Sequence, residues 1–212
     1  MSPIQLAALQ NFQVLKTDLL GPLNQEDCSS VPHGVMIKLI NLLDNIFFMG
    51  SLGPDVAFTW EGDNEQQENG SFGRTDSWIN SRGHVVHEIC MDPIDIPVRG
   101  RTTLASARLG ILLHEMLHAF IYRCACTECC TSPANVDGSD RHSHGRAWHR
   151  LATALEQYAP ELLGTAEIDL GRWMMLKQWI ERLREAEQDG ASFEYGRVWK
   201  PSIHDVRSFG FV

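Results

Sequence analysis

The sequence predicts an α+β protein in which helices pack on a small mixed β-sheet. Two short apolar runs, Val56–Trp60 and Val85–Met91, are typical of buried strands. They are flanked by longer stretches whose apolar residues repeat at helical spacing, and one of these, Ile111–Cys130, contains no proline or glycine. Helices placed around a few strands in this way are typical of the α+β class.

The length and composition limit the kind of protein that this chain can be. A chain of 212 residues with 43% hydrophobic residues can bury one substantial core. The first residues lack the charged start and apolar core of a secretion signal, and we find no run of about eighteen apolar residues. We therefore expect a soluble intracellular protein, nuclear or cytoplasmic, that does not enter a membrane. The pattern does not indicate an oligomeric state.

The N-terminal part predicts two helices and a strand. The first helix extends from Pro3 to Leu20, and a polar break at Asn24–Ser30 separates it from a second helix over about Val35–Met49. The second helix has a wide apolar face, which indicates that it packs on a core. The strand Val56–Trp60 follows, and the polar stretch Gly62–Gly73 predicts a mobile hairpin or loop.

The C-terminal part predicts a helix from Gly145 onward and a long helix over Ala166–Gln188, because apolar residues recur there at helical spacing. We expect an N-terminal helical extension over residues 1–32 and a central domain over residues 33–160. Residues 161–212 would form a C-terminal helix and a tail packed on the same domain.

Residues 114–118 form a His-Glu-x-x-His motif inside the apolar helical stretch. Residues four apart share one face of a helix, so the imidazoles of His114 and His118 can hold the same metal ion. Neutral imidazoles suit zinc, and Glu115 can reach a metal-bound water as a general base. Because the flanking residues are apolar, we favour a metal site over a helix with two surface histidines.

A catalytic zinc site needs a third protein ligand, and three histidines lie downstream of the motif. His144 would stand at the N-terminal edge of the next helix, where Gly145 allows close backbone approach. His149 lies about 140° round that helix from His144. We therefore expect His142 and His149 to be solvent-facing or hydrogen-bonded. Glu156 is the rival ligand, because some His-Glu-x-x-His proteases take a glutamate from a following helix.

Three segments, taken in their order along the chain, resemble a known family. Leu43–Leu52 contains an aromatic pair, a glycine and a leucine; Leu112–Ala119 contains the His-Glu-x-x-His motif; and a His-Gly-x-x-Trp motif begins at His144. Together they resemble the SprT-like zinc metalloprotease family, which includes Spartan-related proteases. The resemblance covers about residues 35–158.

The resemblance implies a zincin-like metalloprotease domain with one catalytic zinc ion. In such a domain His114, His118 and His144 would bind zinc, which favours His144 over Glu156, and Glu115 would be the catalytic base. The substrates would be proteins, among them DNA-associated or crosslinked ones. The alternative is a DNA-binding or scaffold protein that retains the zinc site and cleaves little.

The resemblance also suggests where a substrate would bind. Zincins commonly bind an extended peptide along the edge of a sheet, because pairing through the backbone does not demand a particular sequence. We interpret Val85–Met91 as that edge strand, with His84 and His87 as candidate lining residues. For each of these two histidines we favour the other interpretation, an ordinary strand position with a satisfied side chain.

The cysteines depart from the family pattern. Many members carry a C-terminal zinc ribbon of paired Cys-x-x-Cys motifs, but all six cysteines here lie at or before Cys130. DNA repair is therefore implied by analogy alone. Four cysteines lie close together at Cys124, Cys126, Cys129 and Cys130. They could bind a second zinc ion, form a disulfide or remain partly buried thiols; we favour thiols, because intracellular compartments are reducing.

Six arginines lie in two stretches that contain no acidic residue: Arg99, Arg101, Arg108, Arg141, Arg146 and Arg150. If these side chains converge, the mouth of the site would be basic, which would suit DNA-bound substrates. The net charge of −9 opposes a general attraction to phosphate. We slightly favour the other interpretation, a solvated helix face.

Overall fold

The computed structural model describes residues 1–61, 72–81, 83–94, 96, 98, 102–124, 144, 146–175 and 177. The chain divides into two compact units, of which the first comprises Met1–Cys124 and Ala154–Leu170 and the second Ala125–Thr153 and Gly171–Val212. The first unit contains the whole sheet. The predicted segments 1–32, 33–160 and 161–212 stay predictions.

The first unit begins with two helices, α1 (Pro3–Leu20) and α2 (His33–Phe47), joined through the short 3-10 helix η1 (Pro22–Asn24). Ser2 and Gln5 cap the start of α1, because each side chain accepts a hydrogen bond from the other residue's backbone N–H. α1 packs against α2, and the fully buried residues of α2 include Met36 and Leu39. The predicted helices are therefore present, with α2 starting two residues earlier than expected.

A mixed three-stranded sheet forms the next layer of the first unit. Its strands are β1 (Val56–Trp60), β2 (Gly73–Ile79) and β3 (Val85–Met91), and their order is β1-β3-β2. β1 runs parallel to β3, whereas β2 runs antiparallel to it. The structure confirms the α+β class, the small mixed sheet and the bounds of the two predicted strands.

The interpretation of Val85–Met91 as an edge strand is wrong. β3 pairs with β1 on one side and with β2 on the other, so it is the central strand. Its apolar sequence reflects this position, because a central strand is buried more thoroughly than an edge. β2 was not expected, because its residues facing α4 are small and produce no apolar pattern. In the described residues, β1 and β2 are the strands at the edges of the sheet.

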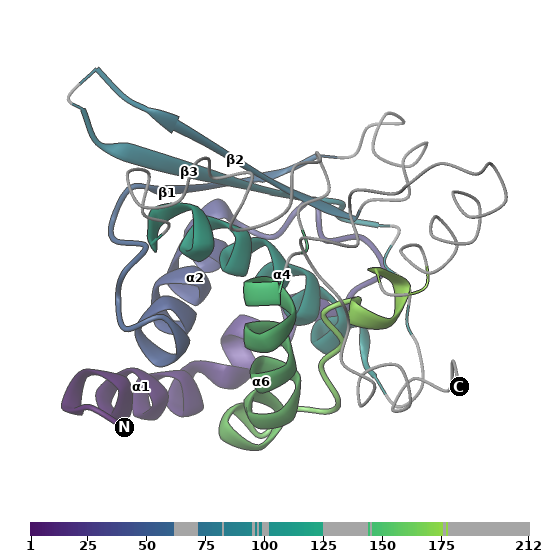
Figure 1. The fold of residues 1–212 in the computed structure, drawn as a ribbon. Helices are drawn as coiled ribbons and strands as arrows, with labels where there is room; N and C mark the ends of the chain where they lie inside the picture. The colour runs from purple at the N-terminus through teal and green to yellow at the C-terminus, as the bar shows by residue number, and fades with distance from the viewer. Residues whose placement is uncertain are drawn as a thin grey trace, which may run out of the picture. The chain divides into compact units, whose positions relative to one another are not determined.

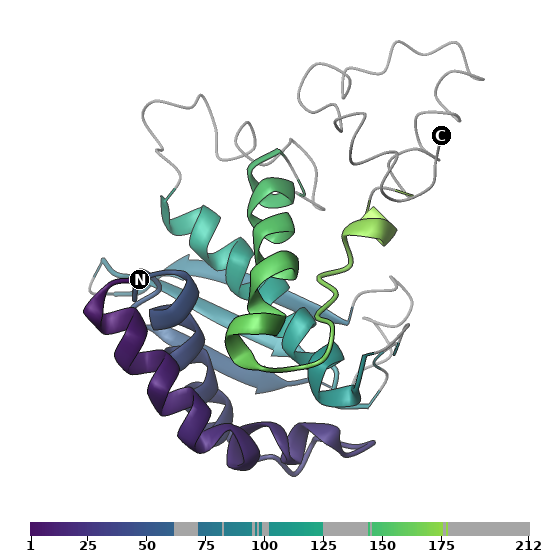
Figure 2. The ribbon, with the colours of Figure 1, turned by 90° about the horizontal axis from the view of Figure 1, so that it is seen from below.

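Helix α4 (Leu104–Cys124) packs on β2 and β3, and α2 packs on β1. Figures 1 and 2 show both helices on the same face of the sheet, with α1 on the far side of α2. Phe48, which follows α2, packs 5.2 Å from Phe120 of α4, measured between ring centroids. α4 contains the apolar flanks of residues 114–118, where a buried helix was expected.

Two further segments complete the described chain. Helix α6 extends over Arg146–Leu163, close to the helix expected from Gly145 onward. The long helix expected over Ala166–Gln188 is wrong at its start, because residues 166–171 are not helical and helical backbone begins at Arg172. Gly171 has a φ of 77°, a left-handed conformation that interrupts a helix.

Among the described residues, α4 alone has the length and apolar composition of a membrane-crossing helix. However, 72% of its most apolar window is buried inside the protein. The core helix of a soluble protein has the same properties, so α4 gives only weak support for a membrane span.

Candidate metal centre

Helix α4 places the two histidines of the His-Glu-x-x-His motif on one face. The apolar side of the helix holds it in the core, since Leu113, Met116 and Leu117 are fully buried. His114 and His118 lie one turn apart and remain partly exposed. Their Nε2 atoms are 3.2 Å apart, so the two rings present the same kind of nitrogen to the same point.

The second nitrogen of His114 faces a backbone carbonyl. His114 Nδ1 lies 2.7 Å from the oxygen of Leu170, which belongs to the extended segment after α6. A carbonyl oxygen can only accept a hydrogen bond, so Nδ1 carries the proton in the neutral ring. Nε2 of His114 is then the nitrogen with a lone pair, which is the form that a metal ion requires.

His144 completes a group of three histidines. One ligand atom from each of His114, His118 and His144 lies within 4.8 Å of the others, and these three side chains could hold a metal ion. His144 precedes α6 and lies edge-on to Trp148, with ring centroids 4.4 Å apart. Trp148 is fully buried. Contact with a buried aromatic ring restricts the orientations that the His144 imidazole can adopt.

The donor set agrees with a small divalent ion. Two nitrogen ligands about 2.0–2.1 Å from a tetrahedral zinc ion lie roughly 3.3 Å from each other. The observed 3.2 Å between the two Nε2 atoms is close to this value. The same distance also suits an N–H···N hydrogen bond between the two rings. The orientation of His114 by a carbonyl is the additional feature expected of a metal ligand.

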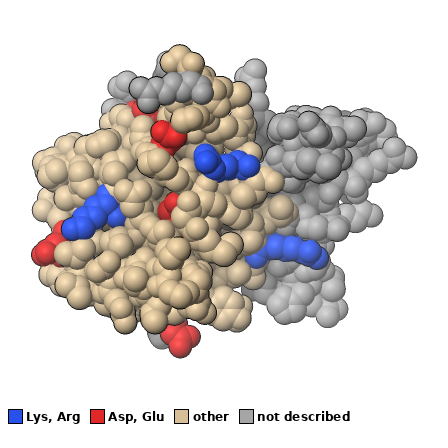
Figure 3. Space-filling model, turned by 90° about the vertical axis from the view of Figure 1, so that its left-hand side faces the viewer, with Lys and Arg blue, Asp and Glu red and all other residues tan. Residues whose placement is uncertain are grey.

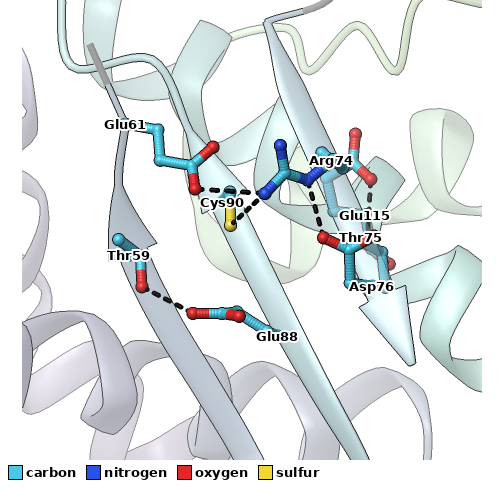
Figure 4. Close-up of polar contacts among 8 residues, drawn as sticks. All are labelled: Thr59, Glu61, Arg74, Thr75, Asp76, Glu88, Cys90 and Glu115. Atoms are coloured by element: carbon cyan, nitrogen blue, oxygen red, sulfur yellow. Dashed lines mark hydrogen bonds and ion pairs between the residues drawn. The ribbon is translucent and has the colours of Figure 1, made fainter. Parts of the chain in front are cut away.

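Glu115 lies beside this group and is held by strand β2. Its side chain is buried, and its Oε1 is 4.0 Å from His114 Nε2. The hydroxyl group of Thr75 lies 2.9 Å from both the backbone oxygen and Oε2 of Glu115. Figure 4 shows Thr75 turned toward Glu115, while the neighbouring Arg74 interacts with Glu61 and Asp76. The carboxylate therefore has a fixed position next to the histidines.

Gly73 gives the Glu115 side chain the room that it needs. A Cβ atom at Gly73 would lie 2.9 Å from Glu115 Oε1 and 2.9 Å from Ile111 Cγ2, closer than real Cβ contacts. A larger residue at this position would therefore push on the carboxylate. Sequence reasoning missed both Gly73 and Thr75, because it assigned Gly73 to the end of a polar loop and predicted no strand over the residues that follow.

Glu156, the rival third ligand, has a different position. Its Oε1 accepts a hydrogen bond from the backbone N–H of Leu170 at 3.0 Å. The candidate ligand group of the described residues contains the three histidines and not Glu156. His149 is outside that group too, but the expectation that it could face solvent is wrong, because it is buried and lies edge-on to Trp148. His142 lies outside the described residues.

The two histidines of the β2–β3 region have contrasting environments. His84 is exposed, with Nδ1 3.6 Å from a carboxylate oxygen of Asp55. His87 is fully buried, and its Nδ1 lies 2.8 Å from the hydroxyl oxygen of Ser77. Burial lowers the pKa of His87, and the positive charge of Arg123 adds to this effect. His87 thus belongs to the core beneath the sheet rather than to an open edge.

The prediction that Arg108 contacts nucleic acid is wrong. Its side chain is fully buried. The guanidinium donates hydrogen bonds of 2.5–2.8 Å to backbone oxygens of Leu23, Gln25, Glu26 and Pro93. Because both terminal nitrogens are used inside the protein, this arginine cannot reach a phosphate. It ties the start of α4 to residues 23–26, which precede α2, and to Pro93, which follows β3.

The prediction that the mouth of the site is basic also depends on the other five arginines. Arg150 is exposed on α6, whereas Arg99, Arg101, Arg141 and the side chain of Arg146 lie outside the described part of the chain. On the face in Figure 3, the Lys and Arg side chains of the described residues stand singly rather than in a patch. Contact with DNA stays a prediction.

The cysteine cluster is described only at its first member. Cys124, the last residue of α4, is exposed and has a free thiol. Cys126, Cys129 and Cys130 lie outside the described residues, so a second zinc site or a disulfide stays a prediction. Cys90, at the sheet, is buried, and burial raises the pKa of its thiol to about 12.

No family model, curated protein or solved structure matches this chain. The geometry around His114, Glu115 and His118 is therefore the basis for assigning a function.

Proposed function

We propose that the chain is a zinc-dependent endopeptidase of the SprT-like type with a zincin-like fold. The observation that carries the proposal is the group of His114, His118 and His144, with the buried carboxylate of Glu115 beside it. Three imidazoles form a ligand set that suits zinc and leaves its fourth coordination position open for water or substrate. A carboxylate next to that position is what a hydrolase needs for proton transfer.

Each residue then has a distinct role. Bound zinc would supply Lewis-acid chemistry, polarising the peptide carbonyl and making water easier to deprotonate. Glu115 would take the proton from the attacking water and deliver it to the leaving amine. Thr75 would donate its hydrogen bond to Oε2 of Glu115. Oε1, which lies 4.0 Å from His114 Nε2, would then be the oxygen closer to the attacking water. His114 would keep the orientation that the Leu170 carbonyl imposes.

The test combines metal analysis with a protease assay on the full chain. We expect about one zinc ion per chain and cleavage of a protein substrate, or of the chain itself, that a chelator abolishes. Glu115→Gln should keep the fold and the zinc, while cleavage falls by at least about 100-fold, since a general base contributes roughly 10²–10⁴-fold. The assay is run with and without single-stranded DNA, because the resemblance implies that DNA-associated proteins are among the substrates.

Two results would count against the proposal. Stoichiometric zinc without any metal-dependent cleavage would favour the alternative of a binding or scaffold protein. Full activity in Glu115→Gln would remove the role given to this carboxylate.

A further inference from the structure

An extended segment after α6 lies against α4 next to His114. Ile168 and Leu170 are buried there, and the Leu170 oxygen is the acceptor for His114 Nδ1. The hydrogen bond joins residues 56 positions apart in the chain, so it exists only while this segment keeps its place on α4. What holds the segment therefore decides how His114 is oriented.

Two features hold this segment, one on each side. On the α6 side, Glu156 Oε1 accepts the N–H of Leu170 at 3.0 Å, so both polar atoms of this residue's backbone are engaged. On the α4 side, Gly110 lies one turn before His114. A Cβ atom at Gly110 would lie 2.2 Å from the backbone oxygen of Asp169 and 3.0 Å from its carbonyl carbon. Since both atoms belong to the backbone, the segment can approach this closely only where the helix has no side chain.

We propose that Glu156 is a positioning residue for the metal ligand His114 and does not bind the metal itself. It fixes the Leu170 peptide so that the carbonyl accepts Nδ1–H and Nε2 points its lone pair toward the ion, and Gly110 provides the space for this arrangement. Hydrogen bonds of this kind orient a metal-binding imidazole and raise its basicity. The inference rests on the metal site of the proposed function but not on its peptidase activity.

The two roles for Glu156 predict different effects of a conservative substitution. In Glu156→Gln the new side chain still offers an oxygen to the Leu170 N–H, so the positioning role survives this change and fails in Glu156→Ala. A glutamine amide is a much poorer zinc ligand than a carboxylate, so a ligand role would fail in both variants. Gly110→Ala tests the same arrangement from the opposite side without touching Glu156.

The experiment measures zinc affinity by chelator competition on the full chain, together with thermal unfolding of the metal-free proteins. Glu156→Ala and Gly110→Ala should bind zinc roughly 10–100-fold more weakly than the wild type, the usual effect of losing such a partner. Glu156→Gln should bind close to wild type. Gly34→Ala is the matched control, because Gly34 is also a helical glycine and an added Cβ would meet nothing within 4 Å.

The outcomes separate this inference from the proposed function. If the wild type binds no zinc, the metal site itself fails. If the wild type binds zinc and Glu156→Ala and Gly110→Ala bind it equally well, the positioning role is overturned. If Glu156→Gln is as weak as Glu156→Ala, Glu156 is a ligand. Should Glu156→Ala not fold, Gly110→Ala and Glu156→Gln decide the question. A loss of metal-free stability with unchanged zinc affinity would show a purely structural role.

Discussion

Thr75 on β2 is hydrogen-bonded to Glu115 on α4, although the two residues lie 40 positions apart in the chain. The hydroxyl oxygen of Thr75 lies 2.9 Å from both the backbone oxygen and Oε2 of Glu115. A hydroxyl has one proton, which the two oxygens share. The contact couples the position of the sheet to that of the carboxylate. It also restricts the side-chain rotation of Glu115.

Thr75→Val should lower the rate of peptide cleavage by roughly tenfold or more. Valine keeps the shape and the β-branch of threonine but removes a hydrogen bond to a charged group, which is worth about 1.5–3 kcal/mol; each 1.36 kcal/mol corresponds to about tenfold in rate. Zinc content should not change. Steady-state kinetics and metal analysis measure the two quantities.

Thr59→Val is the matched control for this substitution. Thr59 lies on β1 and points to the opposite face of the sheet, where its hydroxyl donates to Glu88 at 2.9 Å (Figure 4). The control substitution should therefore leave the cleavage rate near that of the wild type. Equal losses in both variants would indicate a general effect on the sheet rather than on Glu115.

Removing the third histidine should weaken metal binding. His144→Ala takes away one of the three nitrogen donors, so zinc should be lost to a chelator that the wild type resists. His84→Ala, which removes an exposed histidine, should retain wild-type zinc content. Elemental analysis after dialysis gives the comparison. Unchanged zinc affinity in His144→Ala would exclude this residue from the site.

Arg108→Met should destabilise the fold by roughly 3 kcal/mol or more. The substitution leaves backbone oxygens without their donor, and each buried unsatisfied group costs about 1–3 kcal/mol. Arg150→Met, at an exposed position, should change the free energy of unfolding by no more than about 0.5 kcal/mol. Urea unfolding measures both. A small effect at Arg108 would mean that water replaces the guanidinium.

His87 should lower the free energy of unfolding of the protein at acidic pH. Burial and Arg123 lower its pKa below the ordinary value of 6.5, so the unfolded chain binds a proton at a pH where the folded chain does not. The free energy of unfolding therefore decreases as the pH falls from about 6.5 toward the lowered folded-state pKa. Urea unfolding between about pH 5 and pH 7.5 measures this dependence.

His87→Gln should flatten this pH dependence, because glutamine does not titrate. Comparison with the wild type at each pH separates the contribution of His87 from that of the candidate metal ligands. An unchanged slope in His87→Gln would show that His87 does not titrate in this range.

Local spacing was enough to predict several parts of this protein. The helical period identified α1, α2, α4 and α6, and short apolar runs identified β1 and β3, because each element buries side chains at its own characteristic interval. The pairing of His114 with His118 follows from the same period, since residues four apart always share a helix face. These features depend on neighbours in the sequence alone.

The tertiary structure decided the parts that depend on distant contacts. β2 escaped prediction because Gly73, Thr75 and Ser77 face α4 with small side chains, so the strand has no apolar alternation to detect. In the sequence Arg108 cannot be told from a basic surface residue, because its carbonyl acceptors belong to other segments of the chain. No sequence pattern marks the Leu170 oxygen as the acceptor for His114, because every residue carries a carbonyl. Only the packing of this segment against Gly110 brings that oxygen to His114.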